Sequence, residues 1–192
     1  LNLAQIAALL DGNYTPAELL ALAFLLIGYA VKAFAFPSHP IAADAHATAP
    51  SSISVMISGV LTKTGVYGII RIGYVLFKCM NDGAIRALIV FTGCASMLVC
   101  VCMALMQHDF KRLLAFHSIS QIGYILAAIG TGTALGLCGG IYHAINHALF
   151  KGLLFLCAGC VLYRTGTTDL DRLGGLARRM PHTCALFLIA AA

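Results

Sequence analysis

Charged residues are scarce in this sequence of 192 residues: Asp, Glu, Lys and Arg together make up only 10% of it. A soluble domain carries about 25% of these residues and about 45–50% apolar ones, whereas 60% of this chain is hydrophobic. So few charged side chains cannot cover the surface of a globule in water. The composition therefore excludes an ordinary soluble domain and favours a protein of the lipid bilayer.

Carboxylates are scarcer still, with seven Asp and Glu against twelve Lys and Arg, a net charge of +5. No two of them are placed like the acid and base of a hydrolase. The chain also lacks a Gly-rich phosphate loop, a nucleophile motif and a nucleotide fingerprint. We therefore expect neither a catalytic residue nor a cofactor-binding residue here. Because the positive residues do not cluster on a polar face, we expect the bilayer, not nucleic acid, as their partner.

The eight cysteines lie almost entirely within apolar runs. Buried free cysteine behaves as a small hydrophobic residue, so no secreted disulfide framework is indicated. Cys157 and Cys160 form a C-x-x-C, for which redox or metal chemistry is the alternative.

The chain has no basic segment followed by a short apolar core and a cleavage site, so no signal peptide is visible. It begins with Leu1 and ends within the apolar run Cys184–Ala192. We therefore expect a fragment of a longer protein. Residues 1–15 are a mildly apolar lead-in with the turn residues Asp11, Gly12 and Asn13.

Long apolar runs follow the lead-in, each near the roughly 20 residues that a spanning helix needs. They are Pro16–Phe36, Ser52–Phe77, Ala84–Met106, Leu113–Ile129 and Ala134–Tyr163, with another run beginning at Thr183. Backbone groups in lipid must be hydrogen-bonded internally, and these runs are too uniformly apolar for barrel strands. The sequence predicts an all-α transmembrane bundle of about five full spanning helices plus the start of a sixth.

Basic residues in short loops predict the orientation. If the runs alternate in direction, one side carries Lys111, Arg112, Arg164, Arg172, Arg178 and Arg179. The other side carries Lys78 and Arg86, with Arg71 nearby. We therefore expect the first side to be cytoplasmic.

Two prolines within four residues, Pro37 and Pro40, interrupt the first run. Each lacks an N–H, which predicts that Pro37–Pro50 is not one continuous helix and that no unbroken helix joins Leu19 to Ala49. Interrupted helices at membrane depth line water-filled cavities, where ion sites collect. Lys32 precedes this break, so it is a candidate functional residue; the alternative is a Lys that extends to the headgroups.

Lys63 lies near the middle of the second run, between Thr62 and Thr64. An ionisable group at that depth costs at least a few kcal/mol, roughly, and such groups are usually functional. The two threonines could line a hydrated path. Lys63 is therefore the second candidate for ion or proton conduction.

His143, His147 and Lys151 are spaced four residues apart in the fifth run, with Asn146 beside them. This spacing puts the three ionisable groups on one helix face. Such a stripe can pass protons, since an imidazole titrates at about pH 6.5. The alternatives are a packed core His pair and a metal site, but no acidic third ligand lies nearby in the sequence, so we expect no metal.

Three motifs resemble those of the antiporter-like proton-channel subunits of respiratory complex I and its relatives. The first is Pro37-x-His39 followed by Asp44-Ala45-His46. The second runs from Asp109 through Lys111-Arg112 to Gly123, and the third from His143 to Phe155. The similarity extends over about residues 17–192.

The resemblance implies a fourteen-helix core with two inverted five-helix repeats. Residues 16–192 would then form a proton-conducting transmembrane domain, about family helices seven to twelve. Lys32 would be the central proton-carrying lysine of the first half-channel, and Lys63 would be the connecting position on the next helix. The stripe would lie on the polar axis of the second half. The interrupted-helix motif would comprise Pro37, His39, Asp44 and His46.

The implied function is proton translocation within an energy-converting redox complex. The stretch from Gly166 to Pro181 is most similar to the hydrogenase and formate-hydrogenlyase branch, with the NADH-quinone oxidoreductase and multi-subunit cation/proton antiporter branches close. Expected partners are other membrane and redox subunits, with quinone bound only by those partners, in a bacterial or archaeal inner membrane. The alternatives are a subunit of a sodium/proton antiporter, a metal-dependent membrane enzyme and a structural anchor without flux.

Overall fold

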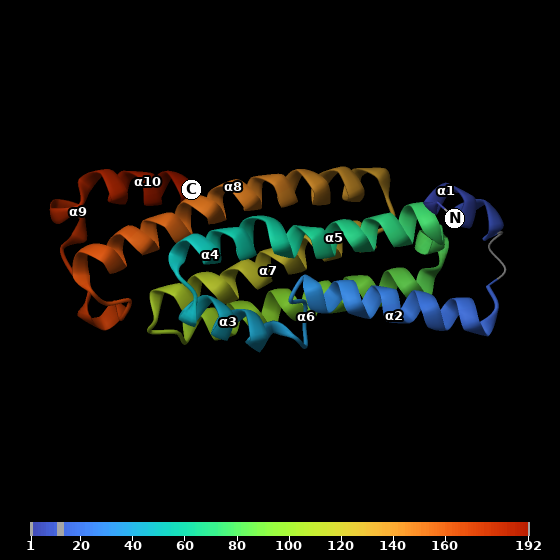
Figure 1. Cartoon of the computed structure of the whole chain (residues 1–192), viewed down its shortest axis with the longest axis horizontal. Helices are drawn as coiled ribbons and strands as arrows, with labels where there is room; N and C mark the ends of the chain where they lie inside the picture. The colour runs from blue at the N-terminus through green and yellow to red at the C-terminus, as the bar shows by residue number, and fades with distance from the viewer. Residues whose placement is uncertain (1, 11–13, 192) are drawn as a thin grey trace.

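The computed structural model describes residues 2–10 and 14–191, so the predicted turn at Asp11, Gly12 and Asn13 lies outside the described residues. The described residues are mostly helical, and the long helices lie side by side along the long axis of an elongated bundle (Figure 1). Across this part of the chain, the only β-type pairing is an isolated bridge between Asp109 and Asp169.

The helices follow one another in the order that the apolar runs predict. They are α1 (Leu3–Leu9), α2 (Pro16–Lys32), α3 (His39–Thr48), α4 (Ser51–Met56), α5 (Thr62–Ile70), α6 (Gly83–Leu105), α7 (Phe110–Gly130), α8 (Ala134–Thr165), α9 (Leu176–Arg179) and α10 (Pro181–Ala191). The π-helical segment Ile57–Leu61 joins α4 to α5, and a second one, Arg71–Leu76, continues α5, so that Ser51–Leu76 forms one span. Short 3-10 helices occupy Cys79–Asn81 and Leu170–Arg172.

Four helical segments of the described residues are long and apolar enough to cross a membrane: Ser51–Leu76, Gly83–Leu105, Phe110–Gly130 and Ala134–Thr165. The predicted all-α transmembrane fold is thereby confirmed. The first predicted span differs in detail, because its helix, α2, has 17 residues and ends at Lys32. The fourth span is longer than the predicted Leu113–Ile129, because Asp109 caps α7 by accepting a hydrogen bond from the backbone N–H of Arg112 at 2.9 Å.

The predicted interruption near Pro37 is present between α2 and α3. Phe34 adopts a left-handed conformation (φ 57°), and the backbone N–H of Phe36 donates to Ser96 Oγ on α6 at 2.9 Å. The expectation that Pro37–Pro50 is not one continuous helix is confirmed, because the helix within this stretch covers only residues 39–48, and no unbroken helix joins Leu19 to Ala49. Pro40 occupies the first turn of α3, where its missing N–H has no helical partner to lose.

Helix α7 lies at the centre of the bundle and packs against α6 through small residues. A Cβ added at Gly93 would lie 2.6 Å from the backbone N of Ala127, and one added at Gly123 would lie 2.6 Å from the Gly93 carbonyl oxygen. Close helix approach through glycine is typical of membrane bundles. Helices α5 and α8 also pack against α7, and α4 packs against α8.

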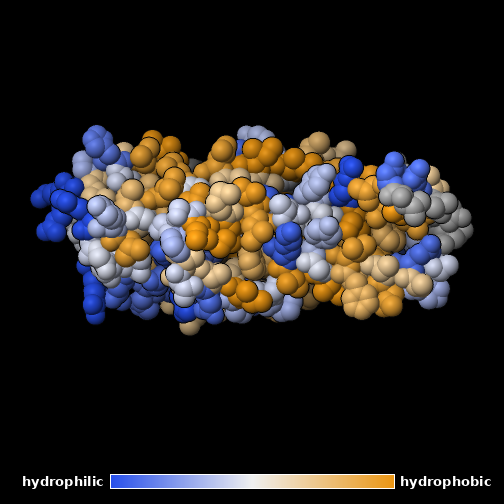
Figure 2. Space-filling view, in the orientation of Figure 1, coloured by the Kyte–Doolittle hydropathy of each residue, from blue (hydrophilic) through white to orange (hydrophobic). Residues whose placement is uncertain are grey.

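The loops after α6 and α8 lie together at one end of the bundle. The Phe110 N–H donates to the Thr168 carbonyl at 2.8 Å, and the Leu170 N–H donates to the His108 carbonyl, also at 2.8 Å. Figure 2 shows hydrophilic side chains gathered at this end, where α9 lies. The loops that carry most of the basic residues therefore share one side, as their alternation along the chain predicts.

Candidate functional site

Two of the sequence-predicted residues, Lys63 of α5 and His147 of α8, are in direct contact. Lys63 Nζ lies 2.8 Å from His147 Nδ1, although the residues are 84 positions apart. Lys63 is half-buried and His147 is fully buried. The structure thus joins the mid-span lysine to the centre of the α8 stripe.

The π-helical segment Ile57–Leu61 supplies the other partner of Lys63. Lys63 Nζ donates to the Ser58 carbonyl oxygen at 2.5 Å, and the Thr62 hydroxyl donates to the same oxygen at 3.0 Å. A π turn departs from regular α-helical hydrogen bonding and is frequent at functional sites. The widened turn therefore offers a backbone acceptor that no pattern in the sequence indicates.

His143 extends this cluster by one helical turn along α8. Its Nε2 lies 2.8 Å from Gln121 Oε1 of α7. Its ring stacks on that of His147, with 6.2 Å between the centroids and 16° between the planes. His143 is half-buried, and Gln121 is a polar partner on α7 that sequence reasoning did not single out.

Lys151 lies one turn further along α8 and is fully buried. Its Nζ donates to the Leu114 carbonyl at 3.3 Å, and the Ser118 hydroxyl donates to the same oxygen at 2.8 Å. Ser58 Oγ in turn donates to Ser118 Oγ at 3.3 Å. Two buried serines therefore connect the surroundings of Lys63 to those of Lys151.

Several buried side-chain atoms within the bundle have no hydrogen-bond partner among the described residues. They are His39 Nδ1, His46 Nδ1, Ser54 Oγ, His117 Nδ1 and His147 Nε2. Buried polar atoms in proteins are nearly always hydrogen-bonded, and water serves where protein groups do not. These atoms mark places where water would be stabilised.

Lys32 is not part of this cluster. It is the last residue of α2, its side chain is exposed, and it makes no hydrogen bond or ion pair with any residue that the structure describes. The next residue, Ala33, is buried against Gly65 of α5, where an added Cβ would lie 2.6 Å from the Ala33 nitrogen. The structure thus places Lys32 beside the interruption and on the outer surface of the described bundle.

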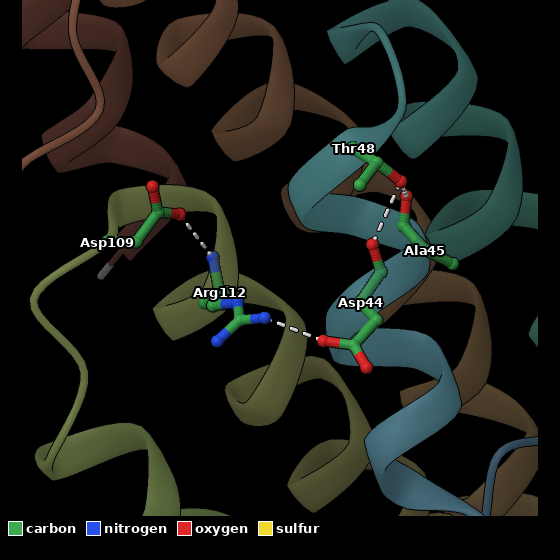
Figure 3. Close-up of polar contacts among 5 residues, drawn as sticks. All are labelled: Asp44, Ala45, Thr48, Asp109 and Arg112. Carbon is green, nitrogen blue, oxygen red and sulfur yellow. Dashed lines mark hydrogen bonds and ion pairs between the residues drawn. The ribbon is translucent and has the colours of Figure 1, made fainter.

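The interrupted-helix motif divides into buried and exposed members. His39 is stacked on Phe36, with centroids 5.6 Å apart, and His46 on Phe155, with centroids 4.7 Å apart. Asp44 is exposed and accepts from Arg112 of α7 at 2.6 Å (Figure 3). The two histidines thus lie inside the bundle, whereas Asp44 fastens α3 to α7 at its surface.

Lys111 is a buried lysine whose place in the sequence indicates only a basic loop. It is 5% exposed, and its Nζ donates to the carbonyl of Ala49, the C-cap of α3, at 2.9 Å. A lysine beside a helix C-terminus complements the unpaired carbonyls there. The sequence does not indicate this contact, because Lys111 stands with Asp109 and Arg112 in a charged run that is typical of a membrane flank.

Metal chemistry finds no geometric support in residues 2–10 and 14–191. Within these ranges no three His, Cys, Asp or Glu side chains come together as a metal site requires. Cys157 and Cys160 are both free thiols, and Cys157 Sγ donates to the Thr183 carbonyl at 3.8 Å. Cys157 is buried, which is the packed setting of structural cysteine, whereas Cys160 is exposed at the surface of α8.

The whole chain, residues 1–192, matches the family described as NADH:quinone oxidoreductase/Mrp antiporter, transmembrane. It is 39% identical over 180 residues to hydrogenase-4 component B of Escherichia coli, covering 86% of this chain and 27% of that protein. It is 36% identical over 174 residues to an Na⁺/H⁺ antiporter subunit of Alkalihalophilus pseudofirmus, covering 91% of this chain and 35% of the relative.

Among solved structures, a chain of the Mrp complex from Dietzia sp. superposes with a TM-score of 0.91 at 34% identity. The match covers 99% of this chain and 35% of that one. The sequence thus spans about a third of the length of the proteins that it resembles.

Proposed function

The chain belongs to the NADH:quinone oxidoreductase/Mrp antiporter transmembrane family, and from that premise we propose that it conducts protons within a membrane subunit of an energy-converting redox complex. It is a multi-pass integral membrane protein. Protons would move along Lys63, His147, His143 and Lys151, while redox chemistry and any quinone would belong to partner subunits. Lys32 would act on the other side of α5, at the interruption.

The contact between Lys63 Nζ and His147 Nδ1 carries this proposal. At 2.8 Å the two nitrogens can share one proton, because two protonated groups would present donors to each other. The pair thus accommodates one excess proton and gives it two alternative positions. Proton transfer between neighbouring side chains requires such an arrangement.

Water would complete the path where side chains do not touch. His147 Nε2 and His117 Nδ1 are buried without a protein partner, and the two serines between Lys63 and Lys151 supply hydroxyls that both donate and accept. Ionisable groups inside a membrane typically mark ion pathways. The alternative is that these side chains have only a structural role in the core, so that proton flux does not depend on them.

A second candidate function is proton conduction coupled to sodium exchange. It is favoured by the 36% identity to an Na⁺/H⁺ antiporter subunit and by the match to an Mrp complex. The side-chain cluster suits either coupling, because both need a titratable line through the membrane. The partner subunits, redox or antiporter, would distinguish the two functions.

Reconstitution of the full-length protein with its partner subunits tests the proposal. Proton uptake into vesicles is followed by quenching of a pH-sensitive dye, once with a redox substrate and once with a sodium gradient as the driving force. Redox-driven uptake that is lost in a Lys63 variant supports the leading proposal. Sodium-driven uptake alone favours the antiporter, and uptake unchanged by loss of Lys63 contradicts both.

A further inference from the structure

The loop between α8 and α10 encloses a basic cavity at the polar end of the bundle. Its volume is about 670 Å³, and three arginines line it: Arg164, Arg172 and Arg179. Arg172 is paired with Asp169, with 3.1 Å between Nε and Oδ2. Within the part of the chain that the structure describes, Arg164 and Arg179 form no ion pair. The cavity therefore holds two arginines whose charge has no counterpart among the residues that the structure describes.

Apolar side chains also line this cavity: Leu173, Leu176 and Met180. Arg164 lies in the last turn of α8, and α10 begins just beyond Met180. The cavity thus lies where two apolar helices meet the polar loop, and Figure 2 shows hydrophilic side chains bordering hydrophobic ones at this end. That level is the one that lipid headgroups occupy.

An apolar groove continues from the cavity along the surface of α8. It has a volume of about 500 Å³ and shares Arg164 and Met180 with the cavity. Its wall along α8 is made by Leu156, Gly159, Cys160 and Tyr163. Tyr163 is 94% exposed, and an exposed tyrosine near a span's end is typical of the membrane interface. The basic cavity therefore adjoins an apolar surface groove that follows the last turns of α8.

We propose that the cavity and groove together bind one anionic phospholipid. Its phosphate would pair with Arg164 and Arg179, since guanidinium groups bind phosphate in a forked geometry. One acyl chain would lie along Leu156 and Cys160 in the groove. The site faces the side that the basic residues predict to be cytoplasmic, the leaflet where anionic lipid attracts Lys and Arg.

The combination of the two hollows favours a lipid over a free phosphate ion. A phosphate ion would use the arginines but leave the adjoining groove without a role. A zwitterionic lipid would fill the groove but carry its own cation to the two unpaired guanidinium groups. Only an anionic amphiphile matches both the charge of the cavity and the hydrophobicity of the groove.

Native mass spectrometry of the full-length protein, titrated with dioleoyl phosphatidylglycerol or dioleoyl phosphatidylcholine, tests the site. We expect phosphatidylglycerol to bind about tenfold more tightly, and Arg164→Ala and Arg179→Ala each to weaken it about fivefold. Arg178→Ala is the matched control, because it removes the same charge one residue away from an arginine that lines the cavity. The affinity of the Arg178→Ala variant for phosphatidylglycerol should stay at the wild-type level.

A second pair of measurements separates the lipid from its headgroup. Cys160→Trp, which fills the exposed groove, should weaken phosphatidylglycerol but leave binding of glycerol 3-phosphate unchanged; Leu156→Trp repeats the test at another position. Equal affinity for the two lipids would overturn the proposal, as would an equal loss in Arg178→Ala and Arg179→Ala. Displacement of phosphatidylglycerol by an equal concentration of glycerol 3-phosphate, with no effect of Cys160→Trp, would show a phosphate site and not a lipid site.

Discussion

Lys63 Nζ lies 2.8 Å from His147 Nδ1, and this contact joins α5 to α8 inside the bundle. The lysine also donates to the carbonyl of Ser58, which lies in a π turn. Because the ring nitrogen must be free of a proton to accept from an ammonium, the protonation states of the two residues depend on each other. Substitution of either residue should therefore affect the other.

Lys63→Ala should lower proton pumping by about tenfold or more while the complex still assembles, because the path loses a titratable group. Lys63→Arg should fail too, since a guanidinium keeps its charge and cannot release its proton. Dye-quenching in proteoliposomes measures the rate, and gel filtration reports assembly. Wild-type pumping by Lys63→Ala would make Lys63 a packing residue.

The Lys63–His147 contact could not be predicted from the sequence, whereas the stripe on α8 could. Helical spacing alone puts His143, His147 and Lys151 on one face, and the cost of charge in lipid predicts that this face turns inward. That Lys63 is the residue facing His147 depends on how α5 and α8 are aligned, since the two residues are 84 positions apart, and on the π turn before Lys63. Neither leaves a periodic signal in the sequence.

Two other residues show where local patterns fall short. Pro40 predicts a break, but it is equally suited to the first turn of a helix, and α3 uses it there. Lys111 stands in a charged run, which predicts a solvated flank, yet its side chain is buried against the end of α3. In both cases the structure depends on where α3 lies in the bundle, which the local sequence does not indicate.

The adjacent residues Lys111 and Arg112 should differ in their effect on stability. Arg112→Ala removes an exposed pair with Asp44 (Figure 3) and should cost less than about 1 kcal/mol. Lys111→Ala leaves the Ala49 carbonyl without its partner and should cost about 1–3 kcal/mol. Thermal unfolding in detergent compares them, and a larger loss from Arg112→Ala would contradict the assigned contacts.

Gly93→Ala should destabilise the bundle by about 1–3 kcal/mol, because its new methyl group would lie 2.6 Å from the backbone of α7. Gly139→Ala is the control: its Cβ would meet no atom within 4 Å. The control should be neutral or slightly stabilising, since alanine favours a helix over glycine. Equal unfolding midpoints for the two variants would show that α6 and α7 do not approach as described.

The final prediction concerns His147, the residue that touches Lys63 and stacks on His143. His147→Leu keeps the volume of the side chain but removes both nitrogens, so it should interrupt the line and depress pumping strongly. His147→Gln retains polar atoms that can hold water but cannot be protonated near neutral pH. It should therefore also pump poorly if the imidazole itself carries the proton.

The two variants together separate conduction from packing. If water alone carried protons past this position, His147→Gln would pump near the wild-type rate and His147→Leu would not. Near-normal rates in both variants would make His147 a core residue without a role in flux. A Lys63→Ala/His147→Leu double variant that is no slower than either single variant would show that the two groups act as one unit, as their 2.8 Å contact requires.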